Sequence, residues 1–363
     1  MLVHLCDRTG PFSAAHASRI RAADDLVAAI NATGGIFGAS IDLQLADTTG
    51  GAEGAQRALA RIIRRYGEGP LVLICDPAAE AAVAQSLNED ELPALTPGLS
   101  ADLSGYSFGL DATPEGHFAF FLEQLRSNWT QWRPPGASNE IRVAIIAWPQ
   151  ELAGELLGED AAEELEEAQL EIVMQAEIPA ELNANYFDPI YQARDLNVNV
   201  IYTNARGFGL AALLNALQDL GLRERFVVAA PGLAFDAQTA EYMHDPSHAD
   251  GLMLTSAWAW WSEAEVPGIQ ELATLQSGIE YQDWGYVQMA GAVSVARRAL
   301  EGAILAEGYE NLGPESVAAA LSDMEDFPAL DGLFVVDYSR DQRSLNELRF
   351  WRVEGGMLEL LLP

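Results

Sequence analysis

Short apolar runs alternate with longer amphipathic segments along most of the chain. A first series of apolar runs lies at 2–6, 41–46, 71–75 and 94–96, and a second lies at 143–147, 170–174, 198–203 and 226–230. Segments with helical spacing of apolar residues separate most of these runs. Strands that alternate with helices form parallel sheets, because each crossover returns the chain to the same end of the sheet. The pattern therefore predicts an α/β protein built from two strand–helix series.

The last third of the chain breaks this alternation. Residues 250–261 indicate an extended segment, and helical spacing returns over 284–307 and 314–324. Three apolar segments close the chain, the last two at 348–353 and 357–362, and the glycines between these two predict a hairpin. Two α/β series followed by a mixed tail indicate two lobes, for which 363 residues are sufficient.

The charge balance narrows the set of partners. The chain has a net charge of −34, and all 20 of its basic residues are arginine. Such a chain repels nucleic acid and anionic membrane surfaces, so neither is expected as a partner. The absence of lysine excludes Schiff-base chemistry on a lysine amine. No apolar run approaches the length of a membrane span, so direct membrane insertion is not expected.

The two cysteines, Cys6 and Cys75, each end a predicted strand. A strand order of 2-1-3 makes these strands neighbours and brings the two sulfurs close together. A disulfide requires demanding geometry, and two buried thiols that act as small apolar residues are the alternative. We expect the thiols to be reduced.

Signals for catalysis and metal binding are weak. His244 and His248 lie four residues apart, but Pro246 between them breaks a helical metal pair. No G-x-S-x-G nucleophile turn occurs. Gly34 and Gly35 end a helix, which is typical of a C-cap rather than of a phosphate-binding loop. We therefore expect no enzyme activity, no cofactor and no metal ion.

Several motifs together resemble a known family. A TGP motif at 9–11 follows the first strand, and the next helix closes on INATGGI at 30–36. Weaker matches follow in the family's order, at 96–100, 143–146, 200–202, 250–252 and 299–301. The chain resembles the type I periplasmic binding proteins, and among them the leucine/isoleucine/valine-binding receptors of ABC importers.

The resemblance implies a specific architecture. The expected fold has two Rossmann-like lobes with parallel sheets, joined by three crossing strands. Lobe one would comprise 1–112 and 253–329, and lobe two would comprise 113–252 and 330–363. The crossings would fall near 110–115, 252–259 and 329–334.

Ligands of open parallel sheets sit beyond the carboxyl ends of the strands, and the resemblance places them in a cleft between the lobes. The expected ligand-binding residues are Thr9, Phe12, Asp76, Leu99, Ser100, Trp148, Asn204, Arg206, Gly207 and Trp258. Arg206 would hold an acidic group, although a surface arginine is the alternative, and Trp148 would cover an apolar group or else belong to the core. Asp76 before Pro77 is typical of a helix N-cap, and it would also accept a hydrogen bond from a ligand amine or hydroxyl.

Three departures from the family's pattern bear on the ligand. Asp76 replaces a serine, Ala15 replaces a pocket tyrosine, and Gly232 lies near the position of the acid that holds the ligand amine. An aspartate would repel the carboxylate of a branched-chain amino acid, so such a ligand is disfavoured. Ser100 retains the expected hydroxyl. His16, in the first helix, is expected to be partly exposed.

The resemblance implies a binding protein rather than an enzyme. The expected function is that of an extracytoplasmic receptor of an ABC importer, which closes over a small polar ligand such as an amino acid, amide or carboxylate. Its other partner would be the membrane permease. The location would be periplasmic or extracellular, with a leader absent from this sequence. The alternative is a cytoplasmic small-molecule sensor of the same fold that regulates a partner protein.

Overall fold

The computed structural model describes residues 1–67, 69, 71–98, 105–149, 155–168, 170–276, 282–339 and 342–362. The chain forms two compact units, which we call unit 1 (Met1–Asp111 and Ala257–Glu347) and unit 2 (Ala112–Ser256 and Leu348–Pro363). The chain therefore passes three times from one unit to the other. Each unit has a sheet that carries parallel strands, and this confirms the expected α/β fold class.

The sheet of unit 1 is parallel throughout. Its strands lie in the order β2-β1-β3-β4-β5, which confirms the predicted order 2-1-3. The strands are β1 (Leu2–Cys6), β2 (Leu43–Asp47), β3 (Leu71–Ile74), β4 (Ala94–Thr96) and β5 (Ser107–Gly109). Leu5 pairs with Ala46 on one side and with Ile74 on the other. The loops that follow β1, β2 and β3 consequently emerge at one edge of the sheet.

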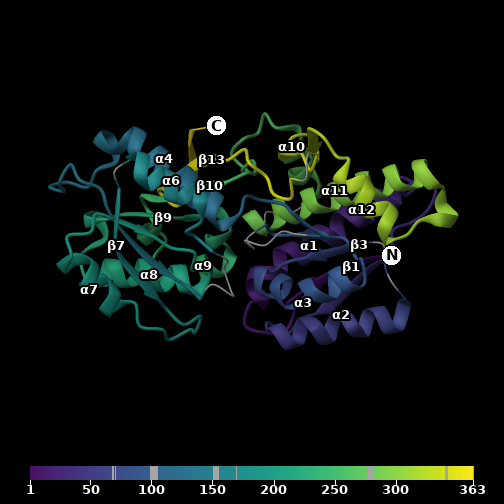
Figure 1. Ribbon diagram of the computed structural model, residues 1–363, viewed down its shortest axis with the longest axis horizontal. Coiled ribbons are helices and arrows are strands. Elements are labelled where there is room, and N and C mark those ends of the chain that lie inside the picture. The colour runs from purple at the N-terminus through teal and green to yellow at the C-terminus, as the bar shows by residue number, and fades with distance from the viewer. Residues whose placement is uncertain are drawn as a thin grey trace. The chain divides into compact units, whose positions relative to one another are not determined.

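Helices cover both faces of this sheet. They are α1 (Ser13–Ala32), α2 (Ala52–Tyr66), α3 (Pro77–Glu89), α10 (Pro267–Leu275), α11 (Trp284–Glu307) and α12 (Pro314–Ser322), with a short 3-10 turn, η4 (Tyr309–Asn311). Figure 1 shows α2 and α3 along one face and α1 and α11 along the other. Val3 and Ile74 of the sheet pack against Leu59 of α2 and Val83 of α3, and all four side chains are buried. Burial of these apolar side chains is the main force that holds the layers together.

The third passage of the chain from one unit to the other lies later in the sequence than expected, between Glu347 and Leu348. Residues 330–347, expected in lobe two, belong to unit 1. Here β11 (Phe327–Ala329) and β12 (Phe334–Val336) form a two-stranded antiparallel sheet that docks on α11. The backbone N–H of Leu330 donates to Ser294 Oγ, and the ring of Phe334 fills the space that a side chain at Gly291 would need. Further along, the backbone N–H of Leu345 donates to the carbonyl of Asp111 at 3.1 Å, which is a second contact of this segment with unit 1.

The sheet of unit 2 is mixed, in the order β14-β13-β10-β9-β8-β6-β7. Its parallel strands are β6 (Arg142–Ala147), β7 (Glu171–Glu177), β8 (Val200–Tyr202), β9 (Val227–Pro231) and β10 (Leu252–Ser256). The terminal strand β13 (Arg349–Glu354) pairs antiparallel with β10, and β14 (Met357–Leu362) pairs antiparallel with β13. They form the predicted hairpin, whose turn Gly355-Gly356 has positive φ at both residues.

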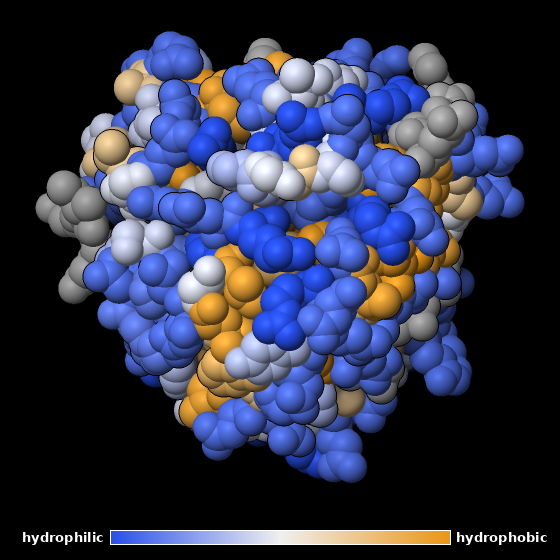
Figure 2. Space-filling model, turned by 90° about the vertical axis from the view of Figure 1, so that its left-hand side faces the viewer, coloured by the Kyte–Doolittle hydropathy of each residue, from blue (hydrophilic) through white to orange (hydrophobic). Residues whose placement is uncertain are grey.

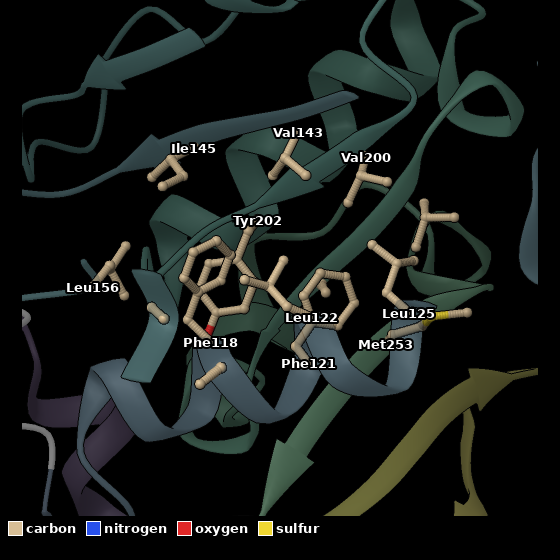
Figure 3. Close-up of a cluster of buried hydrophobic side chains, with 14 of the residues drawn as sticks. Phe118, Phe121, Leu122, Leu125, Val143, Ile145, Leu156, Val200, Tyr202 and Met253 are labelled. Atoms are coloured by element: carbon tan, nitrogen blue, oxygen red, sulfur yellow. The ribbon is translucent and has the colours of Figure 1, made fainter. Parts of the chain in front are cut away.

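The helices of unit 2 also cover both faces of its sheet. They are α4 (Pro114–Trp132), α6 (Glu159–Ala168), α7 (Phe187–Asp195), α8 (Phe208–Asp219) and α9 (Ala237–Tyr242), with the 3-10 turns η1 (Arg223–Arg225), η2 (Gly232–Ala234) and η3 (Pro246–Ala249). Figure 3 shows Phe118 and Phe121 of α4 directed at Tyr202 of β8, and their ring centroids lie 4.6 and 5.5 Å from that of Tyr202. Aromatic contacts of this kind add to the area that the side chains bury.

The surface reflects the acidic composition. Figure 2 shows a mainly hydrophilic face on which apolar residues form scattered patches. Within the described ranges, no helix combines the length and the apolar character that a membrane span requires.

Candidate functional site

In unit 1, the loop after β1 is folded around a buried carboxylate. Asp7 has no exposed surface, and its carboxylate accepts hydrogen bonds from the backbone N–H groups of Gly10 at 2.5 Å and Phe12 at 2.8 Å. Gly10 lies so close to Thr49 that a side chain there would collide with the Thr49 backbone. Phe12 is half-buried, and its ring stacks at 6.4 Å from the ring of His16. The hydrogen bonds to Asp7 and the close approach of Gly10 to Thr49 together define the conformation of this loop.

Thr9 is exposed at the tip of the same loop. Its hydroxyl donates to Asp47 Oδ2 at 2.7 Å, and the backbone N–H of Arg8 donates to Asp47 Oδ1 at 2.9 Å. Burial opposes ionisation of Asp47, yet the hydrogen bonds from Arg8, Thr9 and Thr49 hold the pKa of its carboxyl below the usual value. The ionised Asp47 at the end of β2 thus anchors the loop that carries Thr9.

Asp76 follows β3 and caps α3, as the sequence predicted. Its Oδ1 accepts from the backbone N–H groups of Ala78 at 2.7 Å and Ala79 at 3.3 Å, and Pro77 occupies the first helical position. Its Oδ2 lies 3.4 Å from His16 Nε2. His16 is 2% exposed, so the expectation of a partly exposed histidine was wrong. The first turn of α1 buries the ring between the loops after β1 and β3.

Glu80, one turn further along α3, is fully buried beside this region. Burial raises the pKa of its carboxyl from the usual 4.5 to about 8; a hydrogen bond with Thr96 opposes the shift and the charge of Asp76 adds to it. Glu80 is therefore protonated at neutral pH. Sequence reasoning missed Glu80, although helical spacing could have found it, because positions 80, 83 and 87 share the buried side of α3.

Leu99 and Ser100 lie outside the described residues. Trp258 has no exposed surface; its indole N–H donates to the carbonyl of Leu110 at 2.6 Å, and its ring packs 6.0 Å from that of Trp284. In this arrangement Trp258 belongs to the core of unit 1, and a direct ligand contact is not supported.

In unit 2, Trp148 and Asn204 lie together at the ends of β6 and β8. Asn204 Oδ1 accepts from the backbone N–H of Trp148 at 2.8 Å, and the Trp148 indole donates to the hydroxyl of Tyr186 at 3.1 Å. Burial raises the pKa of Tyr186 to about 12, against the effect of that hydrogen bond. The Trp148 ring packs 5.2 Å from Phe208 and is 2% exposed. Trp148 is thus largely a core residue, which was the alternative interpretation.

Trp148 and Asn204 nevertheless border a cavity of about 330 Å³. Its other walls are formed by β6, by the ends of β7 and by residues 155–157. The lining combines apolar side chains such as Ile145 and Leu156 with the carboxylates of Glu155 and Glu177. A cavity of this chemistry suits a small ligand that has an apolar part and a hydrogen-bond donor.

Arg206 and Gly207 lie between β8 and α8. Arg206 is 9% exposed, so it is not the free surface arginine that was the alternative interpretation. Gly207 caps α8 with a φ of 53°, and its backbone N–H donates to the carbonyl of Ala234 at 3.1 Å. A side chain at Gly207 would collide with Gln238. The left-handed φ and this close approach both require glycine.

The cysteines depart from the expectation. Cys6 and Cys75 lie on neighbouring strand ends, as predicted, but they form a disulfide with Cα atoms 5.1 Å apart, so the expectation of free thiols was wrong. His4 Nε2 lies 3.0 Å from the sulfur of Cys6 and 3.2 Å from that of Cys75. Burial, with the charge of Arg19, lowers the pKa of His4 to about 3, so the ring is neutral.

The same three residues bring metal-ligating atoms within 4.8 Å of one another, a grouping found among the described residues only here. Metals bind cysteine as the thiolate, and the disulfide removes that form. The cluster therefore does not fit a metal ion while the disulfide is intact.

Comparisons with known proteins identify the family. The sequence matches the periplasmic binding protein family over residues 2–357. The chain belongs to this family. The resemblance in its opening motifs is thereby confirmed. No curated protein matches the sequence.

Solved structures support the fold of this periplasmic binding protein. A branched-chain amino acid ABC transporter protein from Thermus thermophilus with bound valine is 17% identical, with a TM-score of 0.83 over 99% of this chain and 95% of that one. A fatty acid ABC transporter substrate-binding protein from Thermomonospora curvata is 18% identical, with a TM-score of 0.82 over 100% and 91%. A solute-binding protein from R. palustris in complex with benzoate is 13% identical, with a TM-score of 0.79 over 99% and 95%.

Proposed function

We propose that this periplasmic binding protein is the extracytoplasmic solute receptor of an ABC importer, with a small polar ligand and a membrane permease as its partners. The observation that carries the proposal is the placement of polar groups at the carboxyl ends of parallel strands in each unit. Thr9 follows β1 in unit 1, and Asn204 and Arg206 follow β8 in unit 2. The similar structures include substrate-binding proteins for quite different solutes, so the family alone does not choose a ligand.

The residues support a ligand other than a simple branched-chain amino acid. Asp76 stands where a ligand carboxylate would have to bind in the amino-acid receptors, and it would repel that carboxylate. In unit 2, Arg206 supplies the cation that an acidic group would need. Trp148, Leu156 and Ile145 provide an apolar wall in a cavity of the same unit, which Asn204 also lines. We propose a small acid that also has an apolar or aromatic part and a hydroxyl or amine donor, since Arg206 offers a cation and the carboxylates of Glu155 and Glu177 offer acceptors in the same unit.

A thermal-shift screen tests this function directly. The compounds are leucine, valine, benzoate and short carboxylates, each acid paired with its neutral amide. At about one hundred times its Kd, a ligand should stabilise the protein by about 2.7 kcal/mol. An acid should stabilise the protein more than its amide if a cation holds the carboxylate.

Arg206→Ala should then weaken binding of the best acid by roughly 1.5–3 kcal/mol, because a hydrogen bond to a charged group is lost. Binding of the matching amide should change little. Arg297→Ala is the control, since Arg297 is an exposed residue of α11 that pairs with Glu301. Tight leucine binding that Arg206→Ala leaves unchanged would contradict the proposed ligand class.

A further inference from the structure

One histidine connects two loops of unit 1 that the proposed function assigns to ligand contact. His16 Nδ1 accepts a hydrogen bond from the backbone N–H of Asp7 at 3.0 Å, at the base of the loop after β1. His16 Nε2 lies 3.4 Å from Asp76 Oδ2, in the loop after β3. The two loops are 69 residues apart in sequence, yet the same ring touches both.

The hydrogen bonds define the protonation of this ring. Because Nδ1 accepts from a backbone N–H, it carries no proton, and the neutral ring carries its proton on Nε2. This nitrogen lies 3.4 Å from Oδ2 of Asp76, whose other carboxylate oxygen caps α3. The ring thus accepts a hydrogen bond from one loop and turns its proton-bearing nitrogen to the carboxylate of the other. A phenylalanine of similar size could fill the space but could form neither link.

A second connection lies on the sheet side of the same loops. The disulfide joins Cys6, which precedes Asp7, to Cys75, which precedes Asp76. It ties the two strand ends together but does not reach the residues beyond them. Asp7 and Asp76 themselves are oriented by hydrogen bonds, and the side chain of His16 contacts both residues.

We propose that His16 is a positioning residue that holds the loops after β1 and β3 in one arrangement before a ligand binds. The inference rests on the proposed function only in that these loops are taken to contact the ligand. Preorganised loops lose less conformational freedom on binding, so affinity benefits although His16 itself touches no ligand.

Three variants separate the two links, and all measurements use the ligand-free full chain. His16→Asn keeps an acceptor oxygen at the Nδ1 position and loses the group that faces Asp76. His16→Gln places an amide donor at the Nε2 position and loses the acceptor for Asp7. His16→Phe removes both. His117→Phe, a buried histidine of unit 2 that contacts Thr255, is the matched control for a generic loss of stability.

The readouts are the exchange rates of individual backbone amides, measured by NMR. The Asp7 amide reports the first link, and the Ala78 amide, which donates to Asp76, reports the second. In His16→Phe both should exchange about tenfold faster than in the wild type, the change expected when a hydrogen bond of about 1.4 kcal/mol is lost. His16→Asn should restore protection at Asp7 alone, and His16→Gln at Ala78 alone.

The nitrogen resonances of His16 in the wild-type protein provide a test that no variant can confound. They should show an unprotonated Nδ1 and a protonated Nε2. A proton on Nδ1, unchanged exchange in His16→Phe, or equal effects of the Asn and Gln variants on both amides would overturn the proposal. None of these readouts needs a ligand, so a failed ligand screen would count against the proposed function alone.

Discussion

Removal of the disulfide should destabilise unit 1 and leave unit 2 unchanged. Cys6 and Cys75 are the only cysteines of the chain, and both belong to unit 1. In the double variant Cys6→Ala/Cys75→Ala, the unfolded chain regains the freedom that the cross-link denies it. The native sheet keeps its backbone pairing between β1 and β3, so the main effect falls on the unfolded state.

The size of the effect follows from the length of the closed loop. The cysteines are separated by 69 residues. The chain-entropy relation gives about 15 cal/mol/K for a loop of that length, or about 4.4 kcal/mol at 25 °C. Unit 1 has about 200 residues, for which each kcal/mol shifts the melting temperature by roughly 2–4 °C. The melting temperature of unit 1 should therefore fall by roughly 9–18 °C.

Calorimetry measures this shift, and the transition of unit 2 is the internal control. Wild-type protein treated with dithiothreitol should show the same loss with the sulfur atoms still in place, whereas the double variant should not respond to the reductant. Thiol titration of unfolded, unreduced wild type should find no free thiol. Two free thiols, or a double variant as stable as the wild type, would refute the reasoning.

Three further predictions concern single residues and charge. Because the pKa of Glu80 rises from 4.5 to about 8 on folding, the folded protein holds a proton that the unfolded chain releases, and stability should fall as pH rises through that interval. The free energy of unfolding in urea should be lower at pH 9 than at pH 5 by on the order of a few kcal/mol, and Glu80→Gln should reduce this difference. An equal pH dependence in the variant would show that Glu80 is not the group responsible. Gly207→Ala should lower the free energy of unfolding by about 1–2 kcal/mol because of the left-handed φ, and by a further amount because the new side chain collides with Gln238. Gly221→Ala, at a φ of 64° in open space, is the control: in the same urea assay it should lose only about 1–2 kcal/mol, the part due to φ. Raising NaCl to 1 M, where the Debye length is about 3 Å, should increase the melting temperature because the net charge of −34 repels itself, and an unchanged value would count against that explanation.

The sequence by itself determined the local elements and the order in which they occur. Alternating apolar and amphipathic segments indicated parallel sheets, and the structure has the strand order 2-1-3 that was assumed for unit 1. The Asp76-Pro77 pair predicted the start of α3, and Gly355-Gly356 predicted the final hairpin. These features depend on residues close together in sequence, whose backbone preferences and side-chain caps act within a few positions.

Only the tertiary structure decided which distant residues meet. Sequence reasoning placed Cys6 beside Cys75 but predicted free thiols instead of a disulfide. It predicted a partly exposed His16, whose ring is buried, and it assigned residues 330–347 to lobe two, whereas they belong to unit 1. It put Trp258 among the ligand residues, whereas the indole binds Leu110 in the core. The physical reason is the same in each case. Burial and hydrogen bonding of a side chain depend on neighbours that the fold supplies from far along the chain, and a local pattern carries no record of them.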